Sequence, residues 1–200
     1  MNATTAYTLL IVLVSLERVT ELVVSQRNLR WSRERGGQEY GRGHYPFMVV
    51  LHVGLLAGAL VEIHRPGHTF EAALVVPMLI LVAASQGLRW WCIASLGPRW
   101  NTRVVIVPGL PRVTSGPYRW LRHPNYVAVV VEGFALPLVG SAWVTALVFS
   151  ALNAPLMAVR IRTEDAALDL LPAASAESTG STEAAGSTGE AGETAPAGAP

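Results

Sequence analysis

The chain has 200 residues, of which 51% are hydrophobic and only 14% charged, with too many long apolar runs for one soluble core. Its formal net charge of +1, in which all 15 basic residues are arginines, argues against a nucleic-acid-binding protein. Cys92 is the only cysteine, which excludes an intramolecular disulfide and a cysteine-based zinc site.

Five apolar segments follow one another along the chain, at residues 6–24, 47–63, 72–93, 124–139 and 141–159. A spanning helix needs about 20 apolar residues, and the first, third and fifth segments have that length. The second is at the short limit. The fourth is short, contains Pro137, and is separated from the fifth by Gly140 alone. The sequence therefore predicts an all-α membrane protein with about five transmembrane helices, the last two forming a tight hairpin.

Arginines gather in alternate connecting segments and predict the orientation. Five lie between the first and second spans, five between the third and fourth, and two follow the fifth, whereas the loop after the second span has only Arg65. Arginine-rich segments stay on the cytoplasmic side. We therefore expect the N-terminus outside and the C-terminus inside the cell.

The chain divides into a membrane domain, residues 1–171, and a tail, residues 172–200. The tail contains only Pro, Ala, Ser, Thr, Gly and Glu, a composition that predicts disorder. The sequence has no GxGxxG motif after a strand and no P-loop, so a soluble nucleotide-binding fold has no support.

Two polar motifs lie at the predicted cytoplasmic boundary. The first is Gly-Pro-Tyr-Arg-Trp-Leu-Arg-His-Pro-Asn-Tyr at residues 116–126, and the second is Arg-Ile-Arg-Thr-Glu-Asp at residues 160–165. Because the two ends of a helical hairpin emerge on one side, we expect the motifs to meet. A simpler interpretation treats the arginines and tyrosines as interface anchors and His-Pro as a helix start.

The side chains of these motifs suit a polar nucleoside beside an anionic lipid. Tyr118, His123 and Tyr126 offer flat amphipathic surfaces for a heterocycle. Glu164 can bind ribose hydroxyls or an ammonium group. Arg160 is a permanent cation placed where a lipid headgroup would lie.

The order Gly-Pro-Tyr, Arg-His-Pro-Asn-Tyr, hydrophobic hairpin and Arg-x-x-x-Glu-Asp closely resembles the isoprenylcysteine carboxyl methyltransferase family over residues 114–165. A longer match reaches residue 168 and is similar to a bacterial branch encoded beside type III polyketide synthases, whose members O-methylate alkylpyrones and phenolic lipids. The motifs of this longer match are Glu17-Arg18, Glu21-Leu22, Arg27-Asn28, His44-Tyr45, Arg89-Trp90, Ala94-Ser95-Leu96-Gly97, Trp100-Asn101-Thr102 and Arg160-Ile161-Arg162-Thr163-Glu164.

The resemblance implies a role for each matching residue. Arg160 would be the catalytic residue that faces the nucleophilic oxygen of the substrate. Strand-like residues ending at Arg112 and Val113 would contact S-adenosylmethionine through the backbone. The other cofactor-binding residues would be Tyr118, His123, Pro124, Asn125, Tyr126 and Glu164. Asp165 after Glu164, without the longer acidic run and C-terminal segment of eukaryotic members, counts against a prenylated-protein substrate more than against methyl transfer.

Other polar residues are weaker candidates for lining a substrate cavity. Charges inside a span are functional candidates, although those near its end can snorkel to the surface. This group comprises Glu17, Glu21, His44, Tyr45, Arg89 and Glu132. His123 is an alternative general base. No metal site is expected, since His44 and His52 lie more than two helical turns apart.

The first functional hypothesis is S-adenosylmethionine-dependent O-methylation of a lipidic hydroxypyrone or phenol in the bacterial cell membrane. The second is carboxyl methylation of an isoprenylcysteine-like acid. N-methylation of an aminophospholipid is the third, and Arg160 counts against it because an amine gains nothing from a facing cation. A non-catalytic membrane adaptor or small transporter is the alternative of another class. The expected partners are a lipidic substrate and the bilayer, without nucleic acid, and the branch implies a functional link to a type III polyketide synthase.

Overall fold

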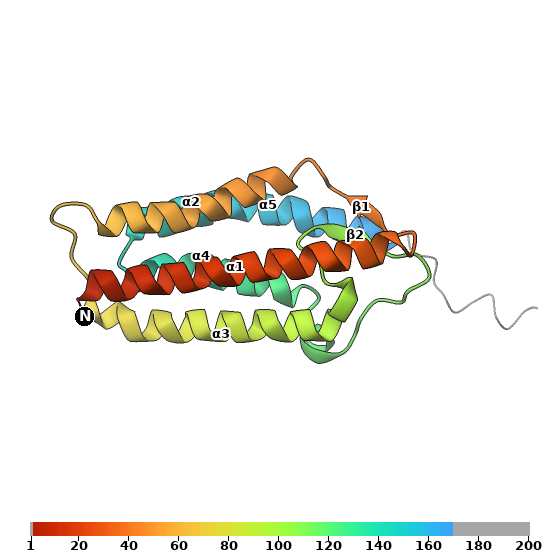
Figure 1. The fold of residues 1–200 in the computed structure, drawn as a ribbon, viewed down its shortest axis with the longest axis horizontal. Coiled ribbons are helices and arrows are strands. Elements are labelled where there is room, and N and C mark those ends of the chain that lie inside the picture. Colours follow the sequence, from red (N-terminus) through yellow and green to blue (C-terminus); the bar gives the residue numbers. More distant parts are fainter. Residues whose placement is uncertain (1, 170–200) are drawn as a thin grey trace, which may run out of the picture.

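The structure, a computed structural model, describes residues 2–169 and is a bundle of five helices with a small polar cap at one end (Figure 1). The helices are α1 (Ala3–Arg33), α2 (Tyr45–Ile63), α3 (Ala72–Leu96), α4 (Pro124–Val139) and α5 (Trp143–Asp169). The cap contains the strands β1 (Gln38–Tyr40) and β2 (Val104–Ile106) and the 3₁₀ turns η1 (Gly97–Arg99) and η2 (Gly116–Arg119). The predicted tail, residues 172–200, lies outside the described residues.

Three of the described helices are long and apolar enough to cross a membrane: α2, α3 extended through η1, and α5. Helix α4 is apolar but has only 16 residues. Helix α1 has 31 residues, but Glu17, Arg18 and Glu21 interrupt its apolar character. The structure thus has all five predicted helices, and three of them are candidate membrane spans by length and composition. These features support an integral membrane protein. Many large apolar side chains on the outer faces are exposed, as a lipid-facing surface requires.

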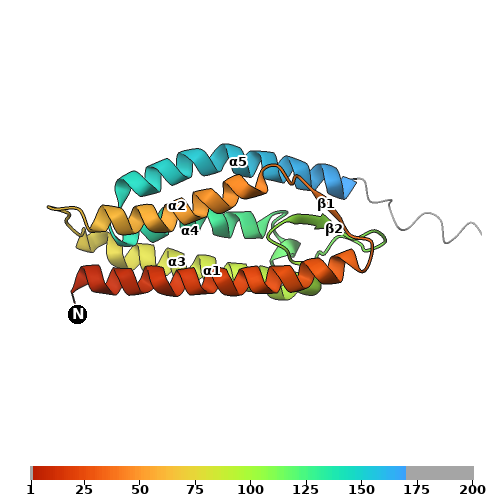
Figure 2. The same cartoon turned by 45° about the horizontal axis from the view of Figure 1, so that its top comes forward.

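Helix α4 packs mainly against α3 and α5, and most of its side chains are buried, although Val127, Val130 and Phe134 form an exposed strip on one side (Figure 2). Ala128, Ala135, Leu136 and Leu138 are each at most 2% exposed. Away from the cap, the core joins residues of α1, α2, α3 and α4, with Tyr7 and Ile11 from α1 among the most buried. The shortest of the five helices is therefore the most buried one.

The predicted hairpin of α4 and α5 is confirmed. Gly140 and Ala142 both donate backbone hydrogen bonds to the Pro137 carbonyl at 3.0 Å, which closes the turn. Gly140 is needed because a Cβ there would lie 2.7 Å from the Tyr7 ring. The Tyr7 hydroxyl donates to the Leu136 carbonyl at 3.0 Å and fastens α1 to the end of α4.

The cap differs from the predicted all-α fold because it contains a two-stranded antiparallel ribbon. β1 pairs with β2, with Gln38 opposite Ile106 and Tyr40 opposite Val104. The strand predicted just before Arg112 and Val113 is wrong in position, since β2 ends at Ile106 and residues 110–115 form neither helix nor strand. Pairing decides the position, because only residues 104–106 lie opposite β1. The arginine-rich segments all gather at this end of the bundle.

Glu62 near the end of α2 fixes the start of α5. Its carboxylate accepts hydrogen bonds from the backbone N–H groups of Val144 and Thr145 at 3.0 and 2.8 Å and from the Thr145 hydroxyl at 2.7 Å. We predict that Glu62→Ala lowers the free energy of unfolding by about 1–2 kcal/mol, because the first N–H groups of α5 lose their acceptor. Thermal unfolding in detergent measures this, with Glu71→Ala as control, because Glu71 is an exposed glutamate in the loop between α2 and α3. Equal melting temperatures for the two variants would contradict this role.

Candidate active site

The structure brings the two polar motifs together at the cap end of the bundle. The Tyr126 hydroxyl accepts a hydrogen bond from Arg160 Nε at 3.0 Å and donates one to Glu164. His123 Nε2 lies 3.2 Å from Asp165 Oδ1. The predicted meeting of residues 116–126 with residues 160–165 is therefore confirmed as geometry.

Local helix geometry positions these side chains. His123 is the N-cap of α4 and Pro124 occupies its first turn, where the missing N–H costs nothing. The His123 and Tyr126 rings stack with centroids 5.4 Å apart and planes 13° from parallel. On α5, Arg160 and Glu164 are four residues apart and share one face of the helix. The Tyr126 ring at the start of α4 thus contacts Arg160 and Glu164 of α5, and the His123 ring contacts Asp165.

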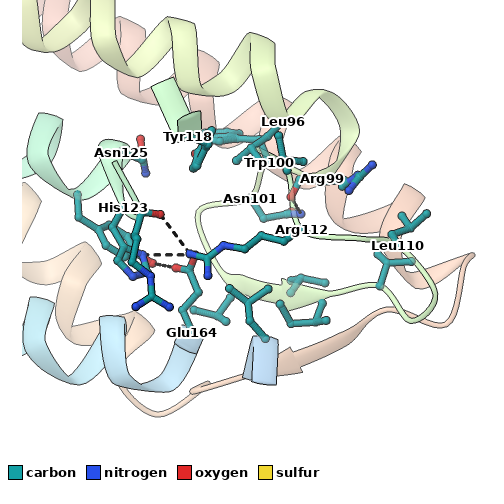
Figure 3. A pocket seen from close by; sticks show the side chains of 18 of the residues that line it. Leu96, Arg99, Trp100, Asn101, Leu110, Arg112, Tyr118, His123, Asn125 and Glu164 are labelled. Carbon is teal, nitrogen blue, oxygen red and sulfur yellow. Dashed lines mark hydrogen bonds and ion pairs between the residues drawn. The ribbon is translucent and has the colours of Figure 1, made fainter. Parts of the chain in front are cut away.

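A cavity of about 140 Å³ lies between this junction and the cap (Figure 3). We call it the polar cavity because charged and polar side chains make up about half of the residues that line it. Seven of the predicted cofactor residues line it: Arg112, Val113, Tyr118, His123, Asn125, Tyr126 and Glu164. Pro124 is fully buried and does not line it. The Arg112 side chain extends across the cavity, and its Nη2 lies 3.5 Å from the Arg122 carbonyl. Burial and the neighbouring Cys92 thiol raise the pKa of Tyr118, so its phenol stays protonated.

Trp100 and Asn101 also line this cavity, although the sequence did not single them out as site residues. Three buried polar atoms of the wall have no hydrogen-bond partner among residues 2–169: Trp100 Nε1, Asn101 Oδ1 and Asn125 Oδ1. An unpaired buried polar atom is costly, so such atoms in a cavity wall indicate a polar ligand that satisfies them. The motif Trp100-Asn101-Thr102 was visible in the sequence, but its burial and unpaired atoms were not.

A second, apolar cavity of about 180 Å³ adjoins the first. Leu22 of α1 and Val49, Val53 and Leu56 of α2 contribute to its wall, and Leu22, Val49 and Val53 are 40–60% exposed on the outer face. Trp100, Asn125, Tyr126 and Arg160 line both cavities. A ligand in the polar cavity and a ligand in the apolar one would therefore meet at these four residues.

The six predicted substrate-cavity residues separate into two groups. Glu21, Tyr45 and Arg89 line the apolar cavity, and Glu17, His44 and Glu132 do not. Glu17 accepts hydrogen bonds from Gln86 and from Trp90 Nε1 instead.

Glu132 is held in a buried ion cluster, where it accepts from Arg18 and Arg89, both at 2.7 Å. His44 lies at the start of α2, where burial and the charge of Arg160 lower the pKa of its imidazole.

Arg160 is the most informative residue of the site. It is only 4% exposed, yet within residues 2–169 it forms no ion pair with a carboxylate. Its Nη2 donates to the Thr102 carbonyl at 2.7 Å, and its Nη1 faces the weak acceptor Met48 Sδ at 3.0 Å. A buried cation without a carboxylate is expensive. The junction of the two cavities is thus suited to an anion.

We predict that Tyr126→Phe destabilises the ligand-free protein by about 2 kcal/mol, because Arg160 Nε and Glu164 lose the hydroxyl that joins them. Thermal unfolding in detergent measures the change. Tyr40→Phe is the matched control, since among residues 2–169 the Tyr40 hydroxyl bonds only to Gln38, on the exposed surface of the cap. If the Tyr126→Phe protein is as stable as the Tyr40→Phe protein, the hydrogen bonds of the Tyr126 hydroxyl to Arg160 and Glu164 do not contribute to the free energy of unfolding.

Comparison with known proteins identifies the family of this site. A model of the isoprenylcysteine carboxyl methyltransferase (ICMT) family matches residues 78–170, which contain every residue that lines the polar cavity. The uncharacterized protein YpbQ of Bacillus subtilis is 37% identical over 164 residues, covering 80% of this chain and 95% of YpbQ. An uncharacterized protein of Haemophilus influenzae is 27% identical over 155 residues, covering 77% of this chain and 90% of that protein. No solved structure matches. The chain belongs to the isoprenylcysteine carboxyl methyltransferase family of membrane methyltransferases.

Proposed function

We propose that this protein is an S-adenosylmethionine-dependent O-methyltransferase that acts on a lipidic phenol or hydroxypyrone. The observation that carries the proposal is Arg160, a buried cation without a carboxylate partner among the described residues, located where a polar and an apolar cavity meet. Such a junction suits a substrate whose head is an anionic oxygen and whose body is apolar. The family supports the methyltransferase chemistry.

The residues of the polar cavity fit S-adenosylmethionine. Tyr118 and the stacked pair His123 and Tyr126 provide aromatic surfaces for adenine. Glu164 can accept from ribose hydroxyls or the ammonium group, and the Arg112 guanidinium can pair with the carboxylate. The unpaired atoms of Trp100, Asn101 and Asn125 supply one further donor and two acceptors. Bound S-adenosylmethionine supplies an electrophilic methyl group, whose bond to sulfur breaks as a bond to the substrate oxygen forms.

Arg160 selects the ionised form of the substrate oxygen. A guanidinium beside a phenol or hydroxypyrone lowers the pKa of that hydroxyl, so its proton is released before methylation and no strong base is required. Met48 is the weak partner that such an anion would displace from Nη1. His123, which lies against Asp165, then serves to hold the cofactor rather than to remove a proton.

The apolar cavity would hold the ring and the first part of the tail, which leaves toward the lipid phase beside Leu22, Val49 and Val53. A type III polyketide synthase would produce lipids of this class. We place the cap and the active site in the cytoplasm, because the arginine-rich segments gather at that end of the bundle. A carboxylate fits Arg160 equally well, and the family supports carboxyl methylation of an isoprenylcysteine-like acid as the second candidate.

We predict that Arg160→Ala lowers kcat/KM by at least about 100-fold, whereas cofactor affinity changes by less than about fivefold. Labelled S-adenosylmethionine and 5-pentadecylresorcinol in detergent measure turnover, and calorimetry measures cofactor binding. Arg162→Ala is the control, because Arg162 lies on the exposed face of the same helix. Full turnover by Arg160→Ala would remove this residue from the mechanism.

We also predict that the wild-type protein binds S-adenosylmethionine and that Glu164→Gln weakens this binding by at least about tenfold, through loss of a charged acceptor. Asp169→Asn, an exposed acid at the end of α5, should bind as the wild type does. Calorimetry in detergent compares the three proteins. Absence of binding by the wild type would favour the membrane adaptor or transporter instead.

A further inference from the structure

A second polar group lines the apolar cavity, separate from Arg160. Glu21 of α1 and Arg89 of α3 are 4% and 5% exposed and both contribute to the cavity wall. They belong to a cluster of three carboxylates and two guanidiniums, which comprises Glu17, Arg18, Glu21, Arg89 and Glu132. If all five groups are ionised, the cluster carries one more negative than positive charge. It therefore suits a hydrogen-bond donor rather than an anion.

Two atoms of this cluster have no hydrogen-bond partner among residues 2–169. They are Glu21 Oε1 and Arg89 Nε, which lie 3.5 Å apart without hydrogen-bond geometry between them. Both side chains also form hydrogen bonds within the cluster: Arg18 Nη1 donates to Glu21 Oε2 at 2.5 Å, and Arg89 Nη2 donates to Glu132 at 2.7 Å. One acceptor and one donor without a hydrogen bond thus lie side by side on two residues that line the apolar cavity.

The position of Glu21 relative to Arg160 follows from a chain of contacts. Ser25, one helical turn after Glu21, contacts the Thr102 hydroxyl at 2.9 Å, and the Thr102 carbonyl accepts from Arg160 Nη2 at 2.7 Å. Glu21 therefore lies about one turn, or about 5.4 Å along α1, further from the cap than the layer that holds Arg160. A ligand that reaches both Arg160 and Glu21 in this cavity must extend at least this far along α1.

We infer that Glu21 and Arg89 form a recognition site for a second hydroxyl group of the substrate, one that the enzyme does not methylate. The hydroxyl proton is donated to Glu21 Oε1, and the hydroxyl oxygen accepts from Arg89 Nε. The inference rests on the proposed function for the ring oxygen at Arg160. It narrows the substrate to lipids whose head ring carries two oxygens, one ionised and one neutral.

The test compares 5-pentadecylresorcinol with 3-pentadecylphenol, which has the same tail and one hydroxyl fewer. The wild type should prefer the resorcinol by at least about tenfold in kcat/KM, because a site built for a hydroxyl rejects the analogue that lacks it. In Glu21→Leu this ratio should fall to within about twofold of one, chiefly through the KM of the resorcinol. Glu17→Leu, the same change in the same cluster but outside the cavity, should keep the preference.

Equilibrium binding of the two lipids to the wild type, followed by tryptophan fluorescence without cofactor, separates this inference from the proposed function and needs no variant. Tighter binding of the resorcinol without methylation of either lipid would overturn the proposed function and support the recognition site. Equal binding and equal methylation of the two lipids would overturn the recognition site and leave the methyltransferase intact. Equal loss of preference in Glu17→Leu and Glu21→Leu would also overturn it, since cluster charge alone would then explain the effect.

Discussion

The site depends on one guanidinium that is buried without a carboxylate partner among residues 2–169. Arg160 is held by the Tyr126 hydroxyl and the Thr102 carbonyl, two neutral acceptors that fix its direction without neutralising its charge. The free energy needed to bury such a cation is recovered when an anion arrives. Because Tyr126 also contacts Glu164, the residue that orients Arg160 belongs to the wall of the polar cavity as well. The proposed substrate and cofactor sites would therefore both depend on Tyr126.

The two cavities draw on different parts of the chain. All residues of the polar cavity fall between Leu96 and Leu168, within the segment that the ICMT family model matches. The apolar cavity takes about half of its wall from α1 and α2, which precede that segment. Under the proposed function, the cofactor site would lie in the segment shared with the family, and α1 and α2 would contribute to substrate specificity. The polar residues that α1 and α2 contribute to this wall are Arg18, Glu21, Tyr45 and His52.

Local patterns in the sequence were enough to predict the five helices, the hairpin and the meeting of the His123 and Arg160 motifs, because apolar length and a short turn determine them. Non-local pairing was not predictable in the same way. β2 lies at Val104–Ile106 because β1, more than 60 residues earlier, pairs there. Trp100 and Asn101 were recognised as site residues because they line the polar cavity and have buried polar atoms without hydrogen-bond partners among residues 2–169. The spacing of residues in a sequence does not reveal these properties. Glu17 and Glu21 are one helical turn apart, yet only Glu21 lines the apolar cavity. Glu17 instead accepts hydrogen bonds from Gln86 and Trp90 of α3.

The most direct test of the central claim is an experimental structure of the protein with S-adenosylhomocysteine and 5-pentadecylresorcinol. We expect one ring oxygen within about 3 Å of an Arg160 nitrogen. We also expect Met48 displaced from Nη1, the tail between α1 and α2, and the nucleoside against Tyr118 and His123. A lipid bound elsewhere on the bundle, or a carboxylate of the protein paired with Arg160 in that complex, would contradict the central claim.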